Sequence, residues 1–225
     1  GDAFAKFRAG IVYGGNASRQ GMFEQAISAY QLALLAAEQL QDVSRQIRIQ
    51  SNLGFVEYQF GQTSAALASF TAAEKIALEN NLQRAYVDIL NNKAIVLSEL
   101  GRLDEAKPLY QRVLEYGESA HSVGWVLIAY INLADISLRQ KNYVEAERLA
   151  LTGLQRVPEG KQIESLLTLR VNLAFALAGQ KQLKRARPIF DEVMDYYHKN
   201  NFKTDEQLLW QEWSQALEKN DEYKD

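Results

Sequence analysis

The chain has 225 residues, of which 47% are hydrophobic and 24% are charged, and it contains three prolines and no cysteine. This composition is typical of a folded globular protein, and the absence of cysteine excludes disulfides, thiolate metal sites and cysteine nucleophiles. With 28 acidic against 25 basic residues the formal net charge is −3, which disfavours nucleic-acid binding through a general positive field.

The first residues and the apolar runs bear on the compartment. No apolar run approaches the roughly 18 residues of a membrane span, and the start GDAFAKFRAG lacks the apolar region of a signal peptide. We therefore expect no membrane insertion. Localisation stays open, with the cytoplasm favoured, because a trimmed signal or a missing neighbouring domain also fits a chain that begins with Gly1.

Followed in chain order, the sequence repeats itself at a step of 40 residues. One column is always alanine, a second is glycine or alanine, a third is glycine and then lysine, a fourth is mostly aromatic and a fifth is asparagine. The columns are Ala26, Ala66, Ala106, Ala146 and Ala186; Gly14, Gly54, Ala94, Ala134 and Ala174; Gly21, Gly61, Gly101, Lys141 and Lys181; Tyr30, Phe70, Tyr110, Ala150 and Phe190; and Asn52, Asn92, Asn132 and Asn172. Five columns in one phase indicate an internal repeat.

Each repeat is predicted to be a pair of α-helices. In the second repeat, Leu53 and Val56 mark one helix face, Gly61 breaks the pattern, and Leu67 and Phe70 mark the next face. Glycine at the break can adopt positive φ, as the residue that follows a helix C-terminus often does. We expect the glycine or alanine column to let two backbones cross closely, and the aromatic column to fill the wedge between a hairpin and its neighbour.

The small and aromatic residues of this repeat resemble the tetratricopeptide repeat consensus, in the order Asn52, Leu53, Gly54, Gly61, Ala66, Phe70 and Ala73. The step exceeds the usual length of roughly 34 residues and resembles the long-repeat branch that includes kinesin light chains and the Pins/LGN scaffold. The resemblance implies an all-α, right-handed superhelical solenoid of about five helical hairpins with a C-terminal capping helix. We predict one domain over residues 1–225, with repeats near 7–46, 47–86, 87–126, 127–166 and 167–206 and a cap at 207–225.

Two stretches depart from this pattern or extend it. In the fourth repeat Ala150 and Gly153 replace the aromatic residue and its small apolar neighbour, so the packing angle of that repeat is not predicted. The tail opens with Thr204 and Gln207 at the spacing of a capping box. The helix that follows is expected to cap the fifth repeat with the side formed by Trp210, Trp213 and Leu217.

The asparagine column is not explained by packing, because an amide is a poor core residue and a middling helix former. Steps of four, three and four place each asparagine within a stripe on the first helix of its repeat. The stripes are Arg48-Asn52-Phe55-Gln59, Asp88-Asn92-Ile95-Glu99, Ile128-Asn132-Asp135-Arg139 and Thr168-Asn172-Phe175-Gly179. One asparagine side chain can bond both the C=O and the N–H of a peptide unit, so the column could hold an extended backbone.

This arrangement resembles the asparagine ladder of peptide-binding long tetratricopeptide proteins. The predicted peptide-binding residues are Asn52, Asn92, Asn132, Asn172, Arg48, Phe55, Asp88, Ile95, Ile128, Asp135, Arg139 and Phe175. Arg8 and Arg19 add positive charge at one end, while Val12 stands at the asparagine position of the first repeat and should weaken that end. The alternative is that the asparagines bond neighbouring helices and hold the stack together, and the sequence does not separate the two roles.

Nothing in the sequence favours catalysis. The two histidines, His121 and His198, lie in different repeats, and no phosphate loop, G-x-S-x-G, H-E-x-x-H or calcium-loop pattern occurs. The basic cluster at residues 181–187 is expected to be a solvated turn, because it lacks the interleaved aromatics of a nucleic-acid site. We therefore expect no enzyme, no cofactor and no metal.

The sequence predicts a binding scaffold that holds an extended peptide, or a disordered segment of a protein partner, in a concave groove. Two other hypotheses stay open. One is a sensory domain of a larger bacterial signalling protein that binds a small ligand or peptide signal, and the other is a self-assembly scaffold. A weak homo-oligomer would pair the basic stretch from Arg139 to Arg187 with the acidic stretch from Asp191 to Asp225 of another copy.

Overall fold

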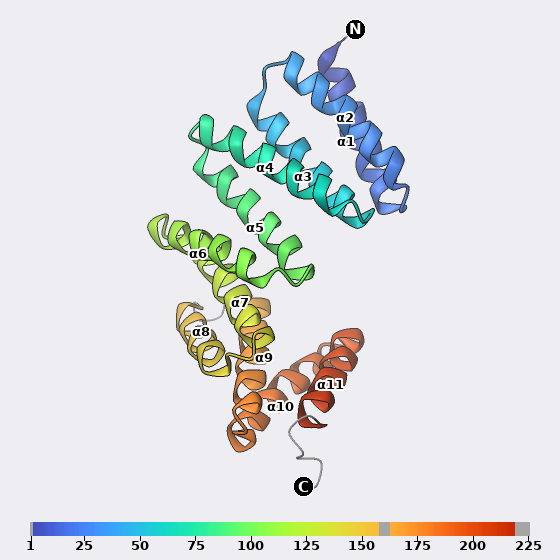
Figure 1. Cartoon of the computed structure of the whole chain (residues 1–225). Helices are drawn as coiled ribbons and strands as arrows, with labels where there is room; N and C mark the ends of the chain where they lie inside the picture. The colour runs from blue at the N-terminus through green and yellow to red at the C-terminus, as the bar shows by residue number, and fades with distance from the viewer. Residues whose placement is uncertain (1, 158–162, 219–225) are drawn as a thin grey trace. The chain divides into compact units, whose positions relative to one another are not determined.

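The computed structural model of the chain describes residues 2–157 and 163–218, and within them every regular element is an α-helix (Figure 1). Most of these helices have 17 residues. They are α1 Ala3–Arg19, α2 Phe23–Gln39, α3 Val43–Gln59, α4 Thr63–Glu79, α5 Gln83–Glu99, α6 Leu103–Ser119, α7 Val123–Arg139, α8 Tyr143–Arg156, α9 Ile163–Gly179, α10 Leu183–Lys199 and α11 Lys203–Glu218.

The helices pack into two compact units, residues 1–109 and 110–225, whose boundary falls within α6. In the first unit α1 packs on α2, α2 on α3, α3 on α4 and α4 on α5; in the second, α7 packs on α8, α8 on α9, α9 on α10 and α10 on α11. The first helices of the repeats begin at residues 3, 43, 83, 123 and 163, four residues before the predicted bounds. The all-α fold of helical hairpins is confirmed, whereas one continuous domain over residues 1–225 stays a prediction.

The turns between helices share one backbone conformation. The turn residue has positive φ, 72° at Gly21, 80° at Gly61 and 74° at Gly101, as predicted for the glycine column. In the first of these turns the N–H of Met22 donates to the carbonyl of Ala17 at 2.9 Å, which is one bond of the Schellman motif that ends a helix. The conformation also occurs at residues other than glycine, in that column and between repeats: Gln41, Asn81, His121, Lys141, Lys181 and Asn201.

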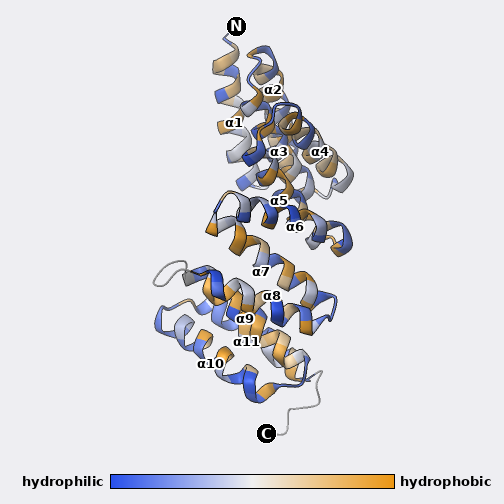
Figure 2. Ribbon diagram, turned by 90° about the vertical axis from the view of Figure 1, so that its left-hand side faces the viewer, coloured by the Kyte–Doolittle hydropathy of each residue, from blue (hydrophilic) through white to orange (hydrophobic). Residues whose placement is uncertain are grey.

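The core of the first unit lies between its hairpins. Tyr30 and Ala33 of α2 pack with Ile49 and Leu53 of α3, so the second hairpin buries its apolar side on the first. Figure 2 shows hydrophobic and hydrophilic residues side by side along the helices, as expected for amphipathic helices that bury one face. Packing of this kind, more than helix propensity, stabilises helices of this length.

Small residues on the first helix of a hairpin make room for the aromatic ring of the second helix. A Cβ atom added to Gly54 would lie 2.7 Å from the ring of Phe70, and one added to Gly14 would lie 2.8 Å from that of Tyr30. The aromatic column at these two positions therefore fills its own hairpin, which differs from the predicted wedge between neighbours. Close approach of backbones occurs instead at Gly10, where an added Cβ would lie 2.7 Å from a carbonyl oxygen of α2.

In the fourth repeat, where alanine replaces the aromatic residue, neighbouring helices fill the space. Ala150 is fully buried. A Cβ added to Gly153 would lie 2.8 Å from the side chain of Leu169 on α9 and 3.0 Å from the Cβ of Tyr130 on α7. The small residues of α8 therefore let larger side chains from both sides reach it.

α11 covers the end of the second unit with a face slightly different from the predicted one. Trp213 is buried and its ring stacks on Phe190 at a centroid distance of 4.4 Å. Leu209 is buried on the same face, whereas Trp210 is 56% exposed. The exposed side of the helix carries the polar residues Gln211, Glu212, Gln215 and Glu218. The predicted cap residues 219–225 lie outside the described residues.

Candidate functional site

In the first unit, Asn52 on α3 and Asn92 on α5 are half-buried, and α3 packs on α5. Among the residues that the structure describes, neither side-chain amide makes a hydrogen bond. An amide that is partly removed from water and unbonded keeps its donor and its acceptor for another chain. These two side chains therefore have the chemistry that the predicted groove requires.

In the second unit the two asparagines have different partners. The side-chain nitrogen of Asn132 donates to the carbonyl of Ile128, one turn earlier in its own helix, at 2.8 Å. Asn172 is buried, and its side-chain nitrogen donates to the carbonyl of Ile131 on α7 at 3.0 Å. Asn172 thus ties α9 to α7, which is the stacking role that the sequence left open.

The remaining predicted residues of the first unit share helix faces with these asparagines. Arg48 is exposed one turn before Asn52, and Phe55 follows it with its ring edge-on to Phe70 at a centroid distance of 5.4 Å. On α5, Asp88 and Ile95 flank Asn92 and both are partly buried. Phe55 therefore belongs partly to the core and offers only one side of its ring to a ligand.

In the second unit the predicted residues lie on α7 and α9. Ile128, Asp135 and Arg139 follow one face of α7, where Arg139 Nη1 lies 3.8 Å from Asp135 Oδ2. Phe175 of α9 is half-buried with its ring edge-on to Trp213 at a centroid distance of 5.7 Å. Each unit brings its own set together, and the alignment of the two sets into one groove stays a prediction.

An arginine cluster that the sequence showed only in part lies beside Asn52. Arg45 and Arg48 of α3 stack over the ring of Phe7 at 5.1 and 5.3 Å, and Arg45 also lies 5.0 Å from the ring of Phe4. Arg8 lies 6.0 Å from the Phe4 ring. Together with neighbouring residues these side chains line a pocket of about 540 Å³. Arg45 was missed because its role depends on the rings of another helix.

Charge in this pocket is only partly compensated. Arg45 Nη1 lies 2.5 Å from Asp42 Oδ2. Arg8 and Arg48 have no carboxylate partner among the described residues. Guanidinium groups stacked on aromatic rings keep their edges free for a carboxylate or phosphate. The pocket is therefore suited to an acidic group that arrives next to Asn52.

Two acidic residues of the stripes have a raised pKa. Burial raises the pKa of the Asp88 carboxyl, and the positive charge of Arg84 opposes this only in part. Burial likewise raises the pKa of Asp135, with Arg139 in the opposing role. A carboxylate kept where its charge costs free energy is typical of a functional site.

Asp88→Asn is expected to raise the melting temperature at neutral pH. Because the folded pKa of Asp88 is raised, its charge destabilises the folded chain above that pKa, and this cost disappears as the pH falls through it. The gain should therefore be complete near neutral pH and absent below the ordinary aspartate pKa of about 3.9. Thermal denaturation over this range measures it. Asp191→Asn, at an exposed position of α10, is the control that should show no gain, and a gain for Asp88→Asn that persists in acid would contradict the expectation.

The basic cluster at residues 181–187, expected to be a solvated turn, begins in the turn before α10 and continues into that helix, where Arg185 is paired with a carboxylate. Arg185 Nη2 lies 2.8 Å from Glu147 Oε1, and Gln180 Nε2 donates to the other oxygen of Glu147 at 2.7 Å. These bonds join the α9–α10 turn and the first turn of α10 to α8. Within the described ranges no group of three or more histidine, aspartate or glutamate residues is arranged to hold a metal ion. None of the helices described is long and apolar enough to cross a membrane.

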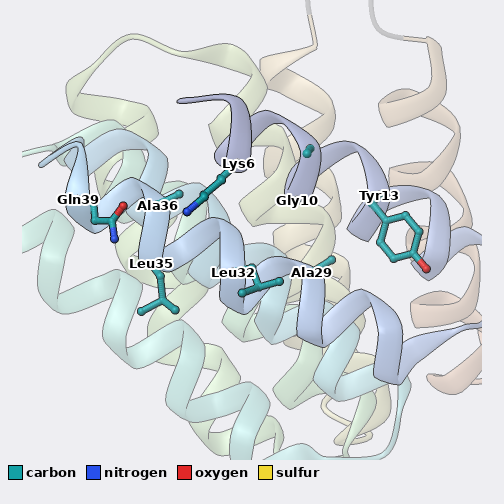
Figure 3. A pocket seen from close by; sticks show the side chains of 9 residues that line it. Lys6, Gly10, Tyr13, Ala29, Leu32, Leu35, Ala36 and Gln39 are labelled. Atoms are coloured by element: carbon teal, nitrogen blue, oxygen red, sulfur yellow. The ribbon is translucent and has the colours of Figure 1, made fainter. Parts of the chain in front are cut away.

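A second pocket lies on the outer face of the first hairpin, where the sequence pattern predicts no site. It has a volume of about 470 Å³ and is lined by Lys6, Ala9, Gly10, Tyr13, Ala29, Leu32, Leu35, Ala36 and Gln39. Figure 3 shows Lys6 and Gln39 at one end and Tyr13 at the other, with Ala29 and Leu32 between them. Leu32 is 64% exposed and Leu35 is 56% exposed. Apolar residues on a helix look the same in sequence whether or not another element covers them.

The sequence matches the tetratricopeptide repeat family over residues 86–159 and again over residues 166–201. No curated protein matches it. Among solved structures, BtubC from P. vanneervenii is 23% identical, with 84% of this chain and 78% of BtubC covered and a TM-score of 0.74. The tetratricopeptide-like repeats of a kinesin light chain from Podosopora anserina are 16% identical, with 86% of this chain and 95% of that chain covered and a TM-score of 0.72.

The quorum sensor NprR from B. thuringiensis is also similar in fold. Its apo form is 18% identical, with a TM-score of 0.75 and 92% of this chain covered, and the match spans only 58% of NprR. NprR in complex with its cognate peptide NprX is 17% identical, with a TM-score of 0.63, and covers 99% of this chain and 63% of that chain. At these identities the likeness shows the fold alone.

The matched segments lie on α5 to α8 and on α9 and α10. The first two hairpins lie outside them and have the same residue columns, the same positive-φ turns and the same 40-residue step. The matched segments are thus tetratricopeptide repeats, and the first two hairpins share their sequence pattern.

Proposed function

We propose that the chain is a non-enzymatic binding module that holds an extended peptide along the asparagines of its first helices. The observation that carries the proposal is the pair of half-buried, unbonded amides at Asn52 and Asn92. They stand 40 residues apart at one register of the repeat, and Asn52 follows Arg48 by one turn of α3. Partners are therefore peptides or disordered protein segments.

The spacing of the helices fits such a ligand. Packed helices lie roughly 8–10 Å apart, and an extended chain advances about 3.3 Å per residue. Each repeat would thus meet about two to three ligand residues, and four repeats would meet about nine to twelve. Because Asn172 is bonded to α7, we expect the grip on the ligand backbone to be strongest at Asn52 and Asn92.

The charged side chains add selectivity to the backbone grip. An acidic ligand residue would pair with Arg8 and Arg48, near Asn52. A basic ligand residue would offset the free-energy cost of the partly buried Asp88 charge on α5. The ligand is thus expected to carry an acidic and a basic residue within a few positions of each other. The complex of the similarly folded NprR with its cognate peptide NprX supports peptide binding by this fold.

A library of random peptides of about twelve residues, displayed on phage, tests the proposal. Peptides selected on the chain should bind the double variant Asn52→Ala/Asn92→Ala about thirtyfold more weakly, since each amide contributes roughly 1 kcal/mol through its hydrogen bonds. The melting temperature of this variant should change little, because neither amide has an internal partner to lose. Isothermal titration and thermal denaturation measure the two quantities.

Asn172→Ala is the matched contrast. It removes the bond to the Ile131 carbonyl, so it should lower the melting temperature while weakening peptide binding less. The proposal fails if no peptide is selected, or if the selected peptides bind the Asn52→Ala/Asn92→Ala variant as tightly as the parent chain. A large fall in melting temperature for that variant with binding retained would assign these asparagines to stacking instead.

A further inference from the structure

The outer face of the first hairpin is formed by the same repeat positions with which the second hairpin packs on the first. Ala9 and Tyr13 of α1 stand 40 residues before Ile49 and Leu53 of α3. Ile49 is fully buried and Leu53 is 3% exposed, because that face of the second hairpin packs on the first. The same face of the first hairpin carries the pocket of about 470 Å³ in Figure 3.

Two residues of this face are also more apolar than their counterparts in the other repeats. Leu32 and Leu35 are apolar and mostly exposed. Their counterparts at the 40-residue step are, for Leu32, Ala72, Arg112, Thr152 and Glu192, and for Leu35, Lys75, Glu115, Gln155 and Asp195. Apolar side chains stand here where most repeats have polar or charged ones. An exposed apolar surface of this kind, floored by small residues, marks an interaction site.

The charges along this face are self-complementary. A further pocket, of about 400 Å³, shares Tyr13, Ala29 and Leu32 with the pocket of Figure 3 and extends the face to Glu24. Lys6 lies in the first turn of α1 and Glu24 in the first turn of α2, so the antiparallel hairpin places them at opposite ends of the face. A twofold axis through the middle of the hairpin would therefore bring each Lys6 to the Glu24 of another copy.

We propose that this face binds the same face of a second copy of the chain, as an isologous dimer about a twofold axis. Leu32 and Leu35 fill the small-residue floor of the partner near Gly10 and Ala29, and Lys6 pairs with the partner subunit's Glu24. Head-to-tail stacking on α11, where Leu208 is 55% and Trp210 is 56% exposed, is the competing arrangement. Unlike the twofold dimer, it does not pair Lys6 with Glu24. The peptide-binding residues take no part in this contact.

Sedimentation equilibrium between about 1 and 100 µM, a range that suits modest interfaces, tests the proposal on the whole chain. The mass should rise with concentration from 25.5 kDa towards twice that value. Leu32→Glu should weaken the dimer at least about tenfold, since it places a charge in the centre of the apolar contact. Leu78→Glu, at a leucine of α4 that is 49% exposed, should leave the dimer unchanged.

Charge reversal tests the twofold register. Lys6→Glu and Glu24→Lys should each weaken the dimer several-fold, because each introduces two like-charge contacts across the axis. The double variant Lys6→Glu/Glu24→Lys restores opposite charges at both ends and should recover the parent affinity. A chain that stays monomeric, a dimer indifferent to Leu32→Glu, or a double variant as weak as the single ones would each overturn the proposal. A monomer would leave the face to a preceding hairpin or another protein.

Discussion

Gly54→Val is expected to lower the free energy of unfolding by about 3 kcal/mol, the upper end of what overpacking a core costs. A Cβ at this position would lie 2.7, 2.8 and 2.9 Å from three atoms of the Phe70 ring. The ring cannot move aside, because Phe70 is fully buried and also meets Phe55 edge-on. Denaturant titration followed by far-ultraviolet circular dichroism measures the loss.

Gly15→Val is the matched control, since a Cβ there has its nearest neighbour, the hydroxyl of Tyr30, at an ordinary 3.6 Å. Valine is no worse than glycine inside a helix, so this variant should be at least as stable as the parent chain. In the Gly54→Val background, Phe70→Leu should return part of the lost free energy by shortening the side chain that clashes. Equal losses at Gly54 and Gly15 would assign the effect to backbone flexibility and contradict the steric account.

This pairing of Gly54 with Phe70 shows how far the repeat columns could be interpreted from sequence. The 40-residue step locates both columns and predicts the helical hairpin, because periodic apolar residues and a glycine break are local signals. Which ring fills which gap is a matter of contact between two helices. The column pattern predicts the ring between neighbouring hairpins, whereas the Phe70 ring lies within its own hairpin, against Gly54.

The turns show a similar division. At Gly21, Gly61 and Gly101 the residue type itself indicates positive φ, because glycine has no Cβ to disfavour it. Lys181 and Gln41 adopt the same conformation without any such signal, because the packing of the helices on either side fixes the turn. A local rule therefore identifies a turn only where the residue type is selective for it.

The sequence predicts which residues of the candidate site share a helix face, but not which of them contact residues of other helices. The stripe through Asn52 and Arg48 follows from helical spacing. The bond from Asn172 to Ile131 does not, since it joins residues 41 apart on different helices. The stacking of Arg45 on Phe4 and Phe7 likewise depends on α1 and α3 lying together. Identical residues in one column therefore have different roles, because the residues around them differ.

Reversing the arginine charges, Arg8→Glu/Arg48→Glu, is expected to weaken acidic peptides selected on the chain about a hundredfold. A hydrogen bond to a charged group contributes roughly 1.5–3 kcal/mol, and two reversed charges would repel the same ligand group, so a loss near 2.7 kcal/mol is reasonable. Both guanidinium groups lack a carboxylate partner among the described residues, so the charge they offer is not already satisfied. Isothermal titration at two salt concentrations measures the loss and its electrostatic part.

The control for that experiment is Lys184→Glu/Arg187→Glu, which changes the net charge by the same amount at exposed positions of α10 in the second unit. It should leave the affinity nearly unchanged, because neither residue lines the arginine pocket and exposed charges are screened by ordinary salt. Selected peptides that lack an acidic residue should bind the Arg8→Glu/Arg48→Glu variant as they bind the parent chain. If both double variants weaken acidic peptides equally, the effect comes from overall charge and the pocket beside Asn52 is not the acidic subsite. If only the arginine variant does so, the acidic residue of the ligand lies at the Asn52 end and fixes the direction in which the peptide runs.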